Sequence, residues 1–334
     1  MITESWLSAV GLDLAAFLEW RRLAGYQFRV QERWLHQFDR YCADHSLSKG
    51  DLTAAVFKAF VQGRATESLA TRQARTRLLS QWAEYLRDHG MEIEGPVLPR
   101  HPVRHPRHEP YIYTRSELRR LFTVIDTWDP PSHSHSNRTV VDPVLFRLLY
   151  GCGLRVMEAL RLLRSAMDLE AGLLHIQQGK GQKDRLVPMA DSLTARCRVY
   201  AAAVHATSAE TTYFFPGFHG GHYDSSTIYV RFRQYLWSAG ISHSGHGPRV
   251  HDLRHAYCVH RLAQWVRTGQ DLTNLLPYLA VYLGHADFRG TEYYLRLTAE
   301  LYPDLVDVLT QAHGAIIPVN PAPKETTLDE NSYQ

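Results

Sequence analysis

The sequence predicts a mainly α-helical protein of two domains, the second of which contains a small β-hairpin or sheet. Apolar residues recur at intervals of three and four through most of 12–90 and 191–312, which is typical of amphipathic helices. Between these regions, segment 95–111 contains five prolines and no hydrophobic period, as expected of an extended linker. Two short apolar runs at 173–176 and 185–187 flank a glycine-rich turn, and this arrangement predicts the hairpin.

The N-terminal region is predicted to form four helices joined by short links. Each helix carries an apolar stripe at helical spacing, and the third and fourth are expected to end at Gly63 and Gly90. We therefore interpret the region as a small all-helical domain. The stripes consist of Leu14, Phe17, Leu18 and Trp20; Val30, Trp34, Phe38 and Tyr41; Leu52, Val56, Phe57, Phe60 and Val61; and Leu69, Leu78, Leu79, Trp82, Tyr85 and Leu86.

The second region begins with a capping box, in which Thr114 and Glu117 precede an apolar run at 118–122. Further helices are expected at 142–150 and 155–163, before the hairpin. The polar C-terminal residues are expected to form a flexible tail. The predicted organisation is thus a helical domain at 1–94, a basic linker at 95–111, a second domain at 112–313 and a tail at 314–334.

The charge balance does not by itself identify a partner. Lys and Arg together number 37 against 34 for Asp and Glu, an excess too small to indicate a nucleic-acid binder. Arginine accounts for 32 of the 37, and its planar guanidinium suits bidentate contact with phosphate or carboxylate. A genome rich in G and C would produce the same bias, so composition leaves both interpretations open.

Several classes of protein are excluded. No run of about 18 apolar residues is present, so no membrane span is expected. The residues that follow Met1 form neither the basic region nor the apolar core of a secretory signal. The four cysteines form no CxxC pair, so neither a disulfide framework nor a thiolate metal site is expected. We therefore predict a cytoplasmic protein.

Two segments in the first half of the second region carry polar residues in unusual arrangements. In 150–160, glycines allow a tight turn that presents Arg155 at the start of a helix, three residues before Glu158. Taken alone, this pattern is typical of a surface ion pair. Lys180 lies between two glycines at the predicted hairpin tip, where it can approach a ligand closely or simply face solvent.

Two further segments lie in the C-terminal third. His251 and Arg254 are three residues apart and share a helix face. His251 and His255 have the HxxxH spacing of some zinc sites, but the glutamate of HExxH is missing and Arg254 would repel a cation, so no metal is predicted. His285 follows a Leu-Gly pair, and Tyr294 lies nine residues further on.

Together, these polar residues resemble the catalytic set of the tyrosine recombinases, the phage integrase family. Types, order and spacing all agree, and the resemblance covers about 112–312. The helical region before it is similar to the family's SAM-like core-binding domain, and segment 276–285 resembles the transposon-encoded branch. The implied fold is a two-domain C-clamp on duplex DNA. The matching residues are Arg155, Lys180, His251, Arg254, His285 and Tyr294.

The resemblance implies a site-specific DNA recombinase, integrase-like or transposase-like, that works without metal, ATP or cofactor. Tyr294 would be the nucleophile that forms a 3′-phosphotyrosine intermediate, with Tyr293 as its rival. Lys180 would protonate the leaving 5′-oxygen, and His251 would assist proton transfer from Tyr294.

The remaining members of the set would act on the phosphate itself. Arg155, Arg254 and His285 would stabilise the negative charge of the transition state. Glu158 would orient Arg155 or His251 without touching the substrate.

Double-stranded DNA is the implied partner, bound mainly through its phosphates. The resemblance also implies a homotetramer on a DNA synapse, alone or with other recombinases. An apolar stripe that begins at Leu301 would dock on the next subunit or on its own domain. The candidate DNA contacts are Arg72, Arg75 and Arg77 of the fourth helix and Arg100, Arg104 and Arg107 of the linker.

Two alternatives remain open. A type IB DNA topoisomerase uses a similar catalytic set, although the four-helix N-terminal region and the Leu-Gly-His motif argue against it. A non-catalytic DNA-binding accessory subunit could keep the same fold, although polar residues at all six positions argue against that interpretation.

Overall fold

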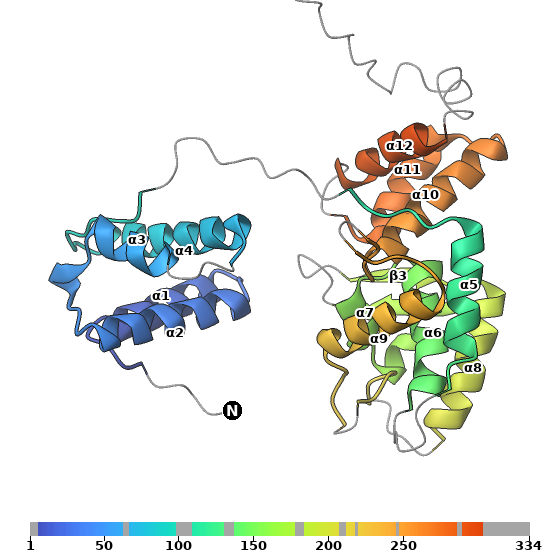
Figure 1. Cartoon of the computed structure of the whole chain (residues 1–334), viewed down its shortest axis with the longest axis horizontal. Helices are drawn as coiled ribbons and strands as arrows, with labels where there is room; N and C mark the ends of the chain where they lie inside the picture. The colour runs from blue at the N-terminus through green and yellow to red at the C-terminus, as the bar shows by residue number, and fades with distance from the viewer. Residues whose placement is uncertain are drawn as a thin grey trace, which may run out of the picture. The chain divides into compact units, whose positions relative to one another are not determined.

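The computed structural model describes residues 6–62, 67–97, 109–129, 137–177, 184–206, 212–217, 220–244, 247–285 and 289–302. The chain divides into two compact units, Met1–Arg107 and His108–Gln334. This division falls within the proline-rich segment 95–111. Figure 1 shows that the first unit is built from helices, whereas the second combines helices with a small sheet.

The first unit contains the four predicted helices, which are thereby confirmed. A short 3-10 turn, Lys49–Asp51, precedes the third of them. On α4, the side chain of Ser68 caps the N-terminus by accepting a hydrogen bond from the Thr71 amide. The helices are α1 (Gly11–Leu23), α2 (Arg29–Asp44), α3 (Ala54–Gln62) and α4 (Leu69–Asp88).

Aromatic side chains form the centre of this unit. Phe38 stacks on Phe57, with ring centroids 5.5 Å apart, and meets Trp82 edge-on at 5.7 Å. All three are fully buried. Such pairs contribute specific geometry in addition to burying apolar area.

Three predicted stripe residues lie outside that core. Val30 and Leu69 lie in the first turns of α2 and α4, and each side chain is nearly half exposed. Trp20 is also nearly half exposed, although its ring contacts Phe17 and Tyr85. Helical spacing predicts which face of a helix is apolar, but not how far neighbouring helices extend to cover it.

Arg75 corrects one of the predicted DNA contacts. The side chain is 2% exposed and forms an ion pair with Glu67. Its guanidinium also lies over the rings of Phe60 and Trp34, at 5.3 and 5.8 Å. The expectation that Arg75 binds DNA phosphate is therefore wrong, because the charge is already used inside the first unit. Arg77, on the same helix, is exposed.

The second unit begins with the expected capping box. The amide of Glu117 donates to the Thr114 hydroxyl, and the Glu117 carboxylate accepts from the Thr114 amide at 2.8 Å. None of the described helices, in either unit, has the length and apolar content needed to cross a bilayer. The helices of this unit are α5 (Arg115–Asp126), α6 (Arg138–Gly151), α7 (Val156–Leu160), α8 (Asp191–Val204), α9 (Ser225–Ser238), α10 (Asp252–Arg267), α11 (Leu272–Leu283) and α12 (Arg289–Leu301).

The predicted hairpin is confirmed as part of a three-stranded antiparallel sheet. The strands β1 (Met167–Asp168), β2 (Leu173–Ile176) and β3 (Arg185–Pro188) lie in that order. Leu173 pairs with Pro188 and Ile176 with Arg185, so the register places Arg185 beside the turn. The hairpin tip, including Lys180, lies outside the described residues.

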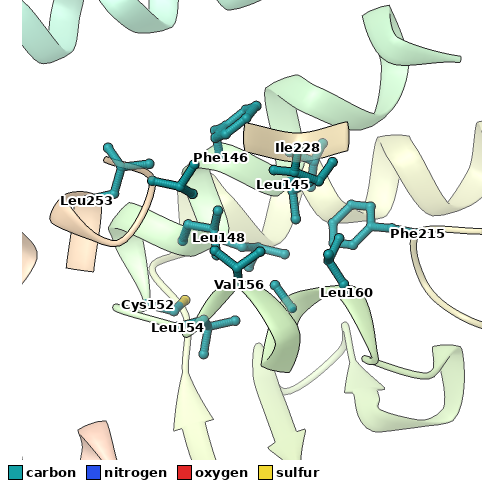
Figure 2. Close-up of a cluster of buried hydrophobic side chains, with 14 of the residues drawn as sticks. Leu145, Phe146, Leu148, Cys152, Leu154, Val156, Leu160, Phe215, Ile228 and Leu253 are labelled. Carbon is teal, nitrogen blue, oxygen red and sulfur yellow. The ribbon is translucent and has the colours of Figure 1, made fainter. Parts of the chain in front are cut away.

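Helix α7 is shorter than the predicted helix at 155–163. It ends at Leu160, and the 3-10 turn Arg164–Ala166 then leads into β1. The short helix is held by burial rather than by its own length, because a helix of five residues is unstable in water. Val156 and Leu160 both point into the main core, as Figure 2 shows.

The main core lies under the turn between α6 and α7. Figure 2 shows Leu145, Phe146 and Leu148 of α6 gathered with residues of this turn and of α9 and α10. Leu154 and Val156, on either side of Arg155, are 1% and 6% exposed. The backbone that carries Arg155 is therefore fixed on both sides by buried side chains.

A second core joins α10, α11 and α12, which Figure 1 shows together at one end of the unit. Its buried residues include Leu262 of α10, Leu279 and Leu283 of α11, and Tyr294 and Leu295 of α12. Tyr294 is therefore part of a packed helical cluster as well as a candidate nucleophile.

Arg75 is buried and Arg77 is exposed on the same helix, so comparing their alanine variants tests whether Arg75 stabilises the first unit. Arg75→Ala should lower the free energy of unfolding of this unit by about 3 kcal/mol, because it leaves the Glu67 carboxylate without its partner. Arg77→Ala, at an exposed position of the same helix, should change it by less than about 0.5 kcal/mol. Urea unfolding of the whole chain followed by circular dichroism measures both effects. Equal stability of the two variants would contradict the assignment of Arg75 to the core.

Candidate active site

Five of the six predicted catalytic residues are described by the structure, and they come from four separate segments. Arg155 occupies the N-cap position of α7, whereas His251 and Arg254 lie at the start of α10. His285 follows α11, and Tyr294 lies on α12. Lys180 belongs to the undescribed hairpin tip, so its predicted position stays untested.

Arg254 connects the segments. Its guanidinium donates to the carbonyl of Gly153 at 2.7 Å and to that of Leu283 at 2.8 Å. The side chain is 2% exposed, and burial lowers the pKa of Arg254 from its ordinary value. A guanidinium stays protonated in proteins, so Arg254 is a buried positive charge held by backbone dipoles.

Arg155 is held by a carboxylate and a carbonyl. It donates to Glu158 at 2.6 Å and to the carbonyl of Gly284 at 3.2 Å. Its side chain is 23% exposed, so it is only partly covered by the protein. The predicted orientation of Arg155 by Glu158 agrees with this contact.

Glu158 also binds Arg185, which the sequence analysis did not identify as a site residue. The two nitrogens of Arg185 donate to the two carboxylate oxygens at 3.1 and 2.9 Å. Burial alone would raise the pKa of Glu158, but the hydrogen bonds and charges of Arg185 and Arg155 lower it to about 2. Glu158 is therefore an anion at neutral pH that holds two arginines.

Two glycines make these contacts possible. Gly153 has φ +58°, and a Cβ there would lie 2.8 Å from the ring of Tyr257. Gly284 has φ +66°, and a Cβ there would lie 2.8 Å from the guanidinium of Arg185. Both positions need a left-handed backbone and close approach, which only glycine accommodates without strain. They are the glycines of the Gly-Leu-Arg and Leu-Gly-His motifs.

The two histidines of the predicted set are placed differently. Burial, together with the charges of Arg254 and Arg155, lowers the pKa of His251 to about 4. His251 is therefore neutral at pH 7. His285 stacks against Tyr294 with ring centroids 6.0 Å apart, and its Nδ1 lies 2.9 Å from the hydroxyl of Thr291.

Tyr294 rather than Tyr293 reaches this cluster. The Tyr294 side chain is 4% exposed, and its hydroxyl lies 2.8 Å from Nδ1 of His255. Burial raises the pKa of this hydroxyl, Cys258 adds to the rise, and Arg254 opposes it. The ring of Tyr293 instead carries Arg296 over its face at 5.6 Å.

His255, one turn along α10 from His251, is the second residue that the sequence analysis did not assign to catalysis. Its spacing from His251 suggests only a zinc ligand pair, and the two rings lie edge to face at 4.9 Å. Within the described residues, no group of three His, Cys, Asp or Glu side chains could hold a metal ion. The HxxxH spacing was the one sequence signal that could have drawn attention to His255.

The remaining predicted DNA contacts are only partly visible. Arg77 is exposed on α4, and Arg72 is half-buried and donates to the backbone carbonyl of Glu67. Arg100, Arg104 and Arg107 lie outside the described residues. These arginines stay predictions.

Comparison with known proteins gives consistent matches. The profile of the phage integrase family matches residues 112–300. A putative integrase/recombinase, y4rE of Sinorhizobium fredii (strain NBRC 101917 / NGR234), is 33% identical over 297 residues, which cover 87% of this chain and 93% of the relative. Tyrosine recombinase XerA of Thermococcus kodakarensis is 31% identical over 221 residues, 65% of this chain and 68% of that protein.

Solved structures share the fold. The Tn1549 transposon integrase, in complex with a circular intermediate DNA, superposes with a TM-score of 0.60 at 13% identity, covering 86% of this chain and 94% of that one. A lambda integrase dimer bound to a COC′ core site gives 0.58 at 15% identity, covering 85% and 76%. The mainly helical architecture with a small sheet, predicted from the sequence, is thereby confirmed.

Because the pKa of buried Glu158 is lowered, its contribution to the free energy of unfolding should depend on pH. Its pKa is lowered from 4.5 to about 2, so its contribution is present above pH 4.5 and is lost as the pH falls towards 2. Glu158→Gln should therefore cost about 3 kcal/mol of unfolding free energy at pH 7, and roughly half of that near pH 3. Urea unfolding at both pH values measures the difference, with Glu170→Gln on an exposed turn as the control. A cost that stays constant with pH would contradict the role of the carboxylate.

Proposed function

The chain belongs to the phage integrase family and is a tyrosine recombinase, and from this premise we propose that it cuts and rejoins DNA with Tyr294 as the nucleophile. The observation that carries the assignment of Tyr294 is its position. Its hydroxyl lies beside His255 and Arg254, and its ring stacks on His285. Tyr293, the rival, has its ring against Arg296.

In the proposed reaction, the phenolic oxygen attacks a DNA phosphodiester. The Oη–P bond forms as the bond from phosphorus to the 5′-oxygen breaks, which leaves a 3′-phosphotyrosine and a free 5′-hydroxyl. The energy of the broken ester is kept in the new one, so the reverse step can rejoin a strand without ATP. Metal and cofactor have no assigned part in this scheme.

We assign charge stabilisation to the two arginines of the site. Both carry five N–H donors, so their bonds to carbonyls and to Glu158 leave donors for the non-bridging oxygens of a phosphate. Donors fixed before the substrate arrives need no reorganisation when charge develops. Arg155, whose side chain is partly exposed, would meet the phosphate first.

His285 is proposed as a third donor. If the hydroxyl of Thr291 donates to Nδ1, then Nε2 carries the ring proton and can donate to a phosphate oxygen. His251, neutral at pH 7, is proposed to assist proton transfer from Tyr294. Lys180 is proposed to protonate the leaving 5′-oxygen.

Neither alternative is favoured by the comparisons. The relatives and structures described above are named as integrases and recombinases, and none of those names is a topoisomerase. The accessory-subunit interpretation has no support in the site, where the described members of the catalytic set lie together.

We extend the proposal to the DNA partner and the oligomeric state of the enzyme. Double-stranded DNA is the partner, and we infer a homotetramer on a DNA synapse, because two duplexes exchange four strands. In support, a lambda integrase structure holds a dimer on DNA. We propose that the first unit, expected at 1–94, adds DNA contacts through Arg72 and Arg77, and that the enzyme acts in the cytoplasm.

Tyr294→Phe tests the assignment of the nucleophile. The variant should form no covalent DNA adduct, while its DNA affinity stays near that of the wild type, because only the phenolic oxygen is lost. Tyr293→Phe is the matched control and should still form the adduct. Denaturing gel electrophoresis of nicked-duplex reactions detects the adduct. An adduct with Tyr294→Phe, together with none from Tyr293→Phe, would reverse the assignment.

The proposed roles of Lys180 and Arg155 can be distinguished by changing the leaving group of the substrate. A substrate with a 5′-bridging sulfur releases a thiolate that needs no proton, so it should restore cleavage by Lys180→Ala by about 10²-fold or more. It should not restore cleavage by Arg155→Ala, because that residue acts on the non-bridging oxygens. Rates of adduct formation on sulfur and oxygen substrates give the comparison. Equal rescue of both variants would refute the separate roles.

A further inference from the structure

The hydroxyl of the proposed nucleophile already has a partner within the same chain. Tyr294 Oη on α12 lies 2.8 Å from Nδ1 of His255 on α10, and the two ring centroids are 5.5 Å apart. His251, predicted to assist proton transfer from Tyr294, lies one turn away and meets His255 edge to face at 4.9 Å. His255 is therefore the histidine in direct contact with the reacting oxygen.

The other polar neighbours of this hydroxyl cannot readily take a proton from it. Arg254 offers only donors. Cys258 is completely buried, and burial raises the pKa of its thiol to about 12, so it holds its own proton at neutral pH. Of these three neighbours, only His255 has a nitrogen that can act as a base, and in the tautomer protonated at Nε2 its Nδ1 accepts the hydrogen bond of the hydroxyl 2.8 Å away.

The reaction needs such an acceptor. A phenol is a poor nucleophile until it loses its proton, and the side chain of Tyr294 is 4% exposed. Burial also raises the pKa of the hydroxyl, which disfavours release of the proton to solvent. A base within hydrogen-bond reach removes this obstacle.

We propose that His255 accepts the hydroxyl proton of Tyr294 as the tyrosine attacks the phosphate. The inference rests on the proposed function and adds a catalytic residue to it. The Oη–H proton passes to Nδ1 of His255, the Oη–P bond forms, and the bond from phosphorus to the 5′-oxygen breaks. The leaving oxygen takes its proton from the general acid, and in the rejoining step His255 returns its proton to Tyr294.

The surrounding charges are compatible with this transfer. The imidazolium formed on His255 would face Arg254 and His251 of its own helix, and Tyr294 of α12. The positive charge of Arg254 opposes a second cation nearby. The negative charge that develops on the phosphorane offsets this repulsion, so the proton moves only as attack proceeds.

The test first requires a substrate. Wild-type enzyme is incubated with nicked duplexes of random sequence, in which a short 5′-hydroxyl fragment diffuses away and traps the covalent adduct. Captured duplexes are sequenced and resynthesised as a defined substrate. Failure of the wild type to form any adduct would overturn the proposed function itself, a result distinct from the outcomes below.

His255→Asn separates proton acceptance from positioning. An Asn carbonyl can accept the hydrogen bond but cannot take the proton, so adduct formation should slow by about 10²-fold or more while DNA affinity stays unchanged. Replacing Tyr294 of this variant with the more acidic 3,5-difluorotyrosine should raise its rate of adduct formation by at least about tenfold. The same replacement in the enzyme that keeps His255 should change the rate much less.

His260→Asn is the matched control. His260 also lies on α10, and its Nδ1 is 3.0 Å from the hydroxyl of another tyrosine, Tyr150. This variant should retain the wild-type rate. If His255→Asn does not fold, as judged by circular dichroism, His255→Gln replaces it. The proposal is overturned if the His255 variant cleaves at the wild-type rate, if difluorotyrosine gives no rescue, or if His260→Asn loses as much activity.

Discussion

The site depends on holding three positively charged guanidiniums close together inside a protein. Like charges repel strongly where the dielectric constant is low, so Arg155, Arg185 and Arg254 need compensation. One carboxylate, Glu158, binds the first two, and backbone carbonyls hold the third. Of these described groups only Glu158 is an anion, so its compensation of the three guanidiniums is incomplete. Under the proposed function, a DNA phosphate would neutralise the remaining positive charge. Burial is the main cause of the depressed pKa of His251, and the charges of Arg254 and Arg155 lower it further.

Carbonyl groups can serve this purpose only if the backbone that carries them cannot turn away. Gly153 and Gly284 take left-handed conformations that point their carbonyls at the arginines, and each lies beside a fully buried leucine, Leu154 or Leu283. At both turns, the glycine allows the left-handed backbone and the neighbouring leucine anchors that backbone in the core. The same pair of residues therefore fixes the path of the turn and the direction in which its carbonyl dipole points. This is a physical reason for the Gly-Leu-Arg and Leu-Gly-His patterns, independent of any relative.

The helices and the hairpin could be predicted because they follow from local patterns, whereas the candidate catalytic set was implied by its resemblance to a known family. Periodicity revealed the apolar faces, and the capping box at Thr114 marked a helix start. Arg185 and His255 could not be assigned, because their importance comes from partners distant in sequence, at Glu158 and Tyr294. Arg75 was misread for the same reason: a basic residue near a helix start resembles a DNA contact until its burial against Glu67 is known.

The proposed nucleophile and the arginines proposed to bind the phosphate belong to different packed clusters. Tyr294 packs with α10, α11 and α12, whereas the turn that carries Arg155 is seated on the main core. The arginines themselves join the two clusters, since Arg155 donates to the carbonyl of Gly284 and Arg185 to that of Tyr282. Hydrogen bonds to charged groups are worth about 1.5–3 kcal/mol each, so sliding one cluster past the other would be costly. The arginines proposed to bind the phosphate thus also link the turn at Arg155 to the cluster that holds Tyr294, and under the proposed function this arrangement would align the two before DNA arrives.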